Sequence, residues 1–131
     1  MANASDYLEA ALLNHVFRNT AYSSPAAVYV GLFDGDPTDD GSGGAEVTTD
    51  IDATGRKAAT FGAPSGGVIT NSADVDFGDA DGDADVSHFG IFDAASAGNL
   101  LAHGSITGGS QSISTGNAVK FAAGDLTITL A

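Results

Sequence analysis

The sequence predicts a mainly β fold, an antiparallel, jelly-roll-like β-sandwich that carries one N-terminal amphipathic helix. Near the N-terminus the apolar residues follow a helical period, whereas later they alternate in short runs rich in β-branched and aromatic residues. Turns rich in Gly, Pro and Asp separate these runs at a spacing typical of all-β domains. The 131 residues fit a single domain. We expect its helix over about residues 6–18 and its β-sandwich over about residues 26–131.

The helix is predicted from a start signal and an apolar stripe. Asp6 stands three residues before Glu9, the spacing of a capping box, in which two side chains satisfy free backbone N–H groups. Leu8, Leu12 and Val16 follow at i, i+4 and i+8 and lie on one face of a helix. We therefore expect this face to be buried against the sheet.

The β-strands are predicted from the short runs that follow. The expected strands are residues 27–33, 57–61, 68–70, 73–77, 86–93, 100–106, 111–113, 118–121 and 126–130. Residues 86–93 and 100–106 flank the turn sequence AASAGN and predict a hairpin. Two acidic loops, residues 34–45 and 79–85, interrupt the strands.

The charge balance excludes two classes of partner. Four basic residues face 17 acidic ones, so the formal net charge is −13. Lys and Arg drive binding to phosphate backbones and to anionic membrane surfaces, so we expect no nucleic acid partner. No apolar run approaches the roughly 20 residues that span a bilayer, and we expect no membrane insertion and no secretory signal. The chain has no Cys, which excludes disulfides and thiolate metal sites.

The kind of acidity suggests the environment of the protein. Fifteen of the 17 acidic residues are Asp, and Lys is rare. Such a surface stays hydrated at molar salt, where repulsion between charges is screened within about 3 Å, and it is typical of proteins from extreme halophiles. A calcium-loaded extracellular protein is the alternative interpretation of the same composition.

The second acidic loop, DADGDAD, is the candidate metal site. Its alternating carboxylates are Asp79, Asp81, Asp83 and Asp85. An EF-hand loop needs Gly at position 6 and Glu at position 12, but counting from Asp79 places Gly82 at position 4 and Gly90 at position 12. We therefore expect a solvated turn and no cofactor, with a weakly bound cation as the alternative.

Residue types with catalytic chemistry are scattered through the sequence. His88 and His103 lie on consecutive expected strands, where they could be cross-strand neighbours, and His15 lies near the end of the helix. Three or four ligands make a zinc site, and the spacings HxH and HxxxH are missing. A GxSxG elbow and a phosphate-binding loop are missing as well. We expect structural histidines, no catalytic or cofactor-binding residue, and no enzymatic activity.

Several longer segments resemble a known family. They are ALLNHVFRNTAYSSPAAVYVGLFDGDP, ATFGAP, NSADVDF, VSHFGIFDAASAGNLLAHGSI and FAAGDLTITL, and they extend from about Leu8 to Leu130. In this combination the chain resembles small virion structural proteins of tailed viruses, described as tail-fibre-like or head-decoration proteins. Together with the acidic composition, the resemblance suggests a tailed virus of halophilic archaea.

The resemblance implies a structural subunit that assembles on the particle surface. The main expectation is a capsid decoration or turret subunit, made in the host cytoplasm and located on the head or tail of the virion. A tail-fibre or tail-tip subunit is the first alternative, and a carbohydrate- or calcium-binding β-sandwich module is the second. The expected partners are copies of itself and the major capsid protein or tail proteins. Because Asp-rich loops repel their own copies, we expect contacts through helix or strand surfaces.

Overall fold

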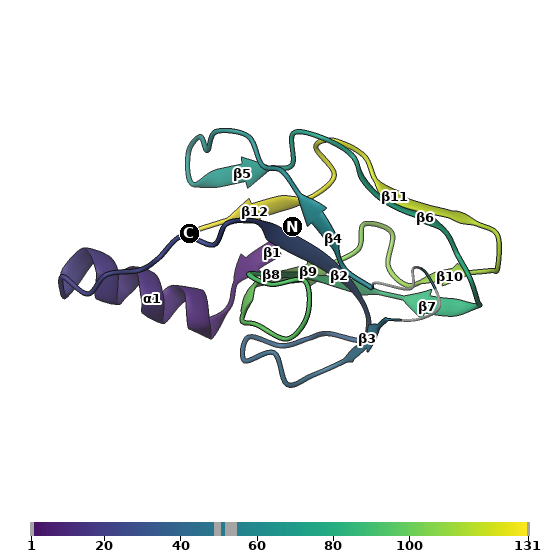
Figure 1. The fold of residues 1–131 in the computed structure, drawn as a ribbon, viewed down its shortest axis with the longest axis horizontal. Coiled ribbons are helices and arrows are strands. Elements are labelled where there is room, and N and C mark those ends of the chain that lie inside the picture. The colour runs from purple at the N-terminus through teal and green to yellow at the C-terminus, as the bar shows by residue number, and fades with distance from the viewer. Residues whose placement is uncertain (1, 49–50, 52–54, 131) are drawn as a thin grey trace.

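The computed structural model describes residues 2–48, 51 and 55–130, and it is mainly β as the sequence predicts (Figure 1). Its helix is α1 (Asp6–Phe17). The strands are β1 (Ala2–Ala4), β2 (Val28–Asp34), β3 (Ala45–Val47), β4 (Lys57–Ala59), β5 (Val68–Thr70), β6 (Val75–Asp79), β7 (Ala84–Val86), β8 (His88–Phe92), β9 (Leu100–Ser105), β10 (Gln111–Ile113), β11 (Ala118–Phe121) and β12 (Thr127–Thr129).

Eight of these strands form the main sheet. Seven follow the order β3-β2-β8-β9-β1-β12-β5, and β4 pairs with β2. The pairs are antiparallel except that β1 runs parallel to β12. Two smaller ribbons, β10-β7 and β11-β6, lie at the end of the molecule opposite α1 (Figure 1). The described sheets are therefore mixed and antiparallel.

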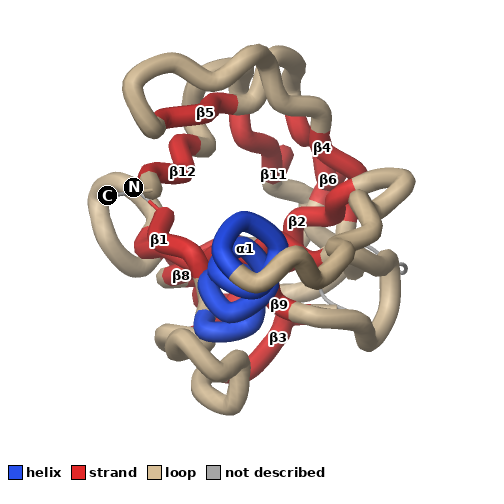
Figure 2. The backbone as a smooth tube through the Cα atoms, turned by 90° about the vertical axis from the view of Figure 1, so that its left-hand side faces the viewer, coloured by secondary structure: helices blue, strands red, loops and turns tan. Residues whose placement is uncertain are grey.

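The main sheet curls until the segments after β4 and β5 meet. Phe61 forms a bridge with Asn71, and the N–H of Gly62 donates to the carbonyl of Thr70 at 3.0 Å. Viewed from the α1 end, the strands surround a common centre (Figure 2). The described residues thus form a barrel-like arrangement, and the expected jelly-roll-like sandwich is not confirmed.

The β8–β9 hairpin confirms the strongest strand prediction. His88 to Phe92 pair with Leu100 to Ser105, and β8 also pairs with β2. Phe92 stacks on Phe33 with ring centroids 6.0 Å apart. Gly90 lies beneath these rings, where an added Cβ would come within 2.9 Å of the Phe92 ring. The glycine of the HFGIF segment therefore leaves room for aromatic packing.

Helix α1 forms where the sequence predicts it, but its packing was predicted wrongly. The N-cap is Ser5 rather than Asp6, and its hydroxyl accepts a hydrogen bond from the Leu8 N–H at 3.2 Å. No residue of α1 is buried, and the side chains of Val16 and Phe17 are 65% and 78% exposed. The reason is that α1 touches β9 and β1 near its start and then projects from the body (Figure 1). A helical period shows which face is apolar and not what covers it.

Candidate functional site

The structure does not gather the second acidic loop around a common point. Asp83 accepts hydrogen bonds from the N–H and the hydroxyl of Thr115 at 2.9 and 3.1 Å, and Asp85 accepts one from the Ser112 hydroxyl at 2.9 Å. Asp79 ends β6, and Asp81 lies in the turn that follows. Within residues 2–48, 51 and 55–130, no three His, Asp or Glu side chains could hold a metal ion together. Weak cation binding here stays a prediction.

The two strand histidines do not face each other across the hairpin. His88 lies opposite Ser105, and His103 lies opposite Gly90, so the two are offset by two residues in register. Nδ1 of His88 lies 2.8 Å from the Ser87 hydroxyl. The sequence placed both histidines on the correct strands, but the alignment of the strands separates them.

His103 instead connects β9 to the first acidic loop. Its side chain is 11% exposed, with Nδ1 3.2 Å from Asp36 Oδ1 and Nε2 2.7 Å from Asp39 Oδ1. Each ring nitrogen of His103 thus faces one carboxylate of the loop. This cluster holds the loop against the sheet. Sequence reasoning missed it because more than 60 residues separate the partners.

Hydrogen bonds inside the first acidic loop hold it in an unusual conformation. Thr38 has a φ of 66°, which is unfavourable for a β-branched residue. Its N–H donates to Asp36 at 2.9 Å, and its hydroxyl donates to Asp40 at 2.7 Å. The Thr38 and Ser42 hydroxyls lower the pKa of Asp40 to about 2. The Thr38 N–H, followed by the charges of His103 and His88, lowers the pKa of Asp36 against the opposing effect of burial.

Arg56 forms a second buried polar cluster. Its Nε and Nη2 donate to the two carboxylate oxygens of Glu46 at 2.7 and 2.9 Å. Nη1 donates to the carbonyls of Ala94 and Ala97 at 2.9 and 2.7 Å, and the guanidinium lies 3.5 Å from the centre of the Phe92 ring. These contacts use four of the five N–H donors of the guanidinium, so Arg56 stabilises the fold by joining these segments.

An apolar hollow lies beside the first turn of α1. We call it the mouth cavity; it has a volume of about 560 Å³ and is lined mainly by aliphatic side chains and one aromatic ring. Its lining includes Leu8, Val28, Ala59, Phe61, Ile69 and Ile128. These side chains are half-buried, so the apolar surface inside the barrel reaches solvent here. None of the described residues that line the cavity is charged.

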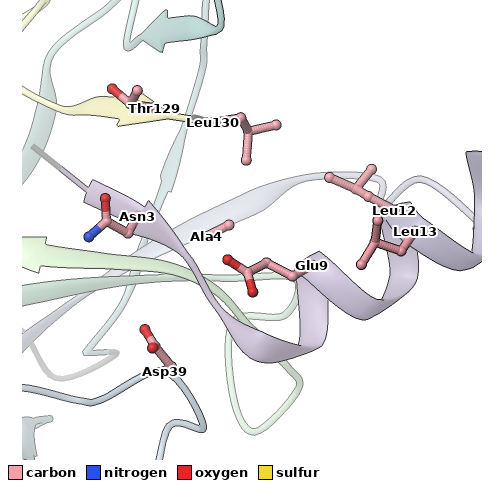
Figure 3. Close-up of a pocket in the computed structure, with 8 residues that line it drawn as sticks. All are labelled: Asn3, Ala4, Glu9, Leu12, Leu13, Asp39, Thr129 and Leu130. Carbon is pink, nitrogen blue, oxygen red and sulfur yellow. The ribbon is translucent and has the colours of Figure 1, made fainter.

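A second hollow lies on the other side of α1 and differs in character. Its volume is about 470 Å³, and Figure 3 shows Leu12 and Leu13 on the helix beside Leu130, which follows β12. The carboxylates of Glu9 and Asp39 also line this hollow (Figure 3). Its two acidic groups make it a poorer apolar surface than the mouth cavity.

The exposed end of α1 carries apolar side chains without acidic ones. We call residues 13–18 (LNHVFR) the helix tip. Leu13, Val16 and Phe17 are 58%, 65% and 78% exposed. Arg18 donates to the Asn14 side chain at 3.0 Å, so its positive charge stays at the tip. No described helix is long and apolar enough to cross a bilayer. The helix tip and the mouth cavity are therefore the candidate interaction surfaces.

Comparison with known families identifies the class of this protein. The family comparison supports a structural protein of a tailed virus. Residues 3–129 match the model of the family described as podophage GP4 fiber I protein gp80, and the chain belongs to that family. No curated protein matches the chain.

Proposed function

We propose that this protein is a tail-fibre or fibre-associated structural subunit of a tailed virus. The match of residues 3–129 to a family named after a podophage fibre protein carries the proposal. The family name favours the fibre alternative over the capsid decoration or turret subunit that was the main expectation from the sequence. The helix tip and the mouth cavity support a function performed through surfaces.

In this function the protein acts without catalysis. The largely buried side chains of His103 and Arg56 bind carboxylates and carbonyls of their own chain and so stabilise loops. Membership of a fibre family points in the same direction. The partners we propose are further copies of this chain and other tail proteins. The Asp-rich surface supports a halophilic host.

Localisation on purified particles tests the proposal. Antibody labelling of intact virions should mark the tail region, and quantitative protein analysis should give few copies per particle relative to the major capsid protein. A capsid decoration would instead give labelling over the whole head and hundreds of copies. That result would contradict the proposed fibre function and would show that the protein decorates the capsid. Absence of the protein from purified virions would overturn both.

A further inference from the structure

We propose that the helix tip of one copy occupies the mouth cavity of a second copy of this chain. The inference rests on the proposed function, in which identical subunits assemble. It deepens that function by naming the two surfaces that meet. Both surfaces involve α1, because Leu8 in its first turn lines the cavity and the rest of the helix projects from the body (Figure 1).

Val16 and Phe17 of the helix tip are largely uncovered within the described part of their own chain. Ser5 fastens the start of α1, since its hydroxyl donates to the Leu100 carbonyl and its N–H donates to the Leu101 carbonyl at 2.9 Å. The N–H of Asp6 also donates to the Asp39 carbonyl at 3.0 Å. These bonds fix the direction of the helix while leaving Phe17 78% exposed. Exposed apolar side chains that cluster in this way mark contact surfaces.

The mouth cavity provides a matching surface. Val28, Ala59, Phe61 and Ile128 are half-buried around it, whereas Val30, further along β2, is fully buried. Apolar side chains from a neighbour would remove this lining from water, which favours association. A helix that lays its apolar face in a hydrophobic groove is a recurrent mode of recognition.

Charge identifies a second copy as the occupant. Two copies that each carry −13 repel each other, so they can meet only where acidic groups are missing. The helix tip contains Arg18 and His15 and no acidic residue, and the described lining of the cavity is uncharged. The positive tip is attracted by the overall charge of the neighbour. Two copies placed end to end could exchange tips and cover both surfaces in one closed contact.

Cysteine cross-linking tests the contact directly, because the chain has no Cys of its own. Phe17→Cys at the tip and Ala59→Cys in the cavity are made as separate full-length variants and mixed at molar salt. A short thiol-specific cross-linker should join them as a heterodimer. Ser110→Cys, an exposed position on the turn between β9 and β10, replaces Phe17→Cys as the matched control and should give no such product.

Sedimentation of a charge variant supplies the second measurement. Phe17→Asp should shift the wild-type oligomer to a monomer with an unchanged circular dichroism spectrum, since the Phe17 side chain is exposed in the single folded chain. Ser110→Asp adds the same charge elsewhere and should leave the oligomer intact. A monomeric wild type, or an oligomer that persists in Phe17→Asp without the Phe17–Ala59 cross-link, would overturn the inference. Cross-linking within one chain of a Phe17→Cys/Ala59→Cys double variant, without any in the mixture, would also overturn it.

These measurements use the purified protein in solution, whereas the proposed function is tested on virions. If copies of the chain contact one another through other surfaces, the proposed contact of the helix tip with the mouth cavity is wrong, but the proposed fibre location is unaffected. Absence from virions would refute the fibre function even if the cross-link formed.

Discussion

At the scale of single residues, a few buried polar side chains join segments that are distant in sequence. Asn71 is 2% exposed and uses its whole amide group. Its Nδ2 donates to the carbonyls of Ala73 and Ala122, and its Oδ1 accepts from the N–H groups of Gly124 and Leu126. Arg56 joins β3, the segment 94–97 and the Phe92 ring in the same manner. Such hydrogen-bonded groups specify one arrangement of the loops.

We predict that Arg56→Lys destabilises the protein by roughly 1–3 kcal/mol. Lysine keeps the charge but cannot bind both oxygens of Glu46 while stacking on Phe92. Chemical denaturation gives the free energy of unfolding of each variant. Arg18→Lys is the matched control, because Arg18 is exposed and its side chain donates a hydrogen bond to the neighbouring side chain of Asn14. Equal stability of the two variants would show that Arg56 contributes little.

We predict that the protein loses stability in acid, because a carboxylate of the first acidic loop has a lowered pKa. The pKa of Asp40 is about 2 in the folded chain, below the unfolded value of about 3.9. A lowered pKa gives a stabilisation that is complete above the unfolded value and is lost as the pH falls through the folded value. The melting temperature should therefore fall between about pH 4 and about pH 2.

Asp40→Asn should reduce this acid dependence, because the variant lacks the titrating carboxyl. Asp81→Asn removes the same charge from the other acidic loop and serves as the control. The measurement is the melting temperature from neutral pH down to the acid range. Identical pH profiles for Asp40→Asn and the wild type would show that the hydrogen bonds of Thr38 and Ser42 do not stabilise the charged form.

At the scale of elements, α1 is attached to the rest of the molecule through its N-cap residue, Ser5. Ser5 is fully buried and serves two purposes, as N-cap of the helix and as donor to the carbonyl of Leu100. The rest of the helix has no buried residue that could hold it in place. The orientation of the helix tip is therefore set at the opposite end of the helix.

We predict that Ser5→Ala destabilises the protein by roughly 1–3 kcal/mol, since it removes an N-cap and leaves a buried carbonyl without its donor. The helical signal in circular dichroism should melt before the β signal. Ser110→Ala is the control at an exposed serine and should melt like the wild type. A single transition at the wild-type temperature in Ser5→Ala would contradict the attachment by this side chain.

The elements differ in how well the sequence predicts them. The β8–β9 hairpin is predictable because its apolar runs and its turn lie within 20 residues of one another. Strand β1 was missed, since Ala2–Ala4 has no β-branched or aromatic residue and becomes a strand only between β9 and β12. Strand β3 was missed because it begins at the end of the expected loop. The main sheet curls because of the register in which its strands pair, and a pattern within a single strand does not determine that register.

The candidate surfaces were predictable only in part. The apolar stripe of α1 was found from its period, but its exposure was not, because the covering surface is a matter of tertiary structure. The mouth cavity combines residues from six strands and the first helical turn, so spacing along the chain gives no sign of it. The carboxylate partners of His103 were missed for the same reason.

At the scale of the whole molecule, net charge sets the conditions for assembly. Each copy carries −13, so bringing copies together raises their mutual repulsion. The Debye length is about 3 Å at 1 M salt and about 30 Å at 0.01 M. Apolar contacts must therefore act against a repulsion that grows as salt is removed.

We predict that dialysis from molar sodium chloride into millimolar buffer dissociates the oligomer, as measured by sedimentation. A few millimolar calcium should restore it poorly, because screening depends mainly on ionic strength. Full restoration by calcium at low ionic strength would instead indicate a specific cation site. The carboxylates to replace in that case are Asp79, Asp81, Asp83 and Asp85. An oligomer that persists in millimolar buffer would show that repulsion is not limiting.

The parallel pairing of β1 with β12 has a consequence for the order in which the protein folds during synthesis. Ala2 pairs with Ile128 on one side and with Gly104 on the other. Strand β1 thus waits for partners made more than 100 residues later. Contacts so distant in sequence are slow to form, and apolar strand edges stay open meanwhile. The nascent chain can complete its main sheet only after residues 127–129 have emerged.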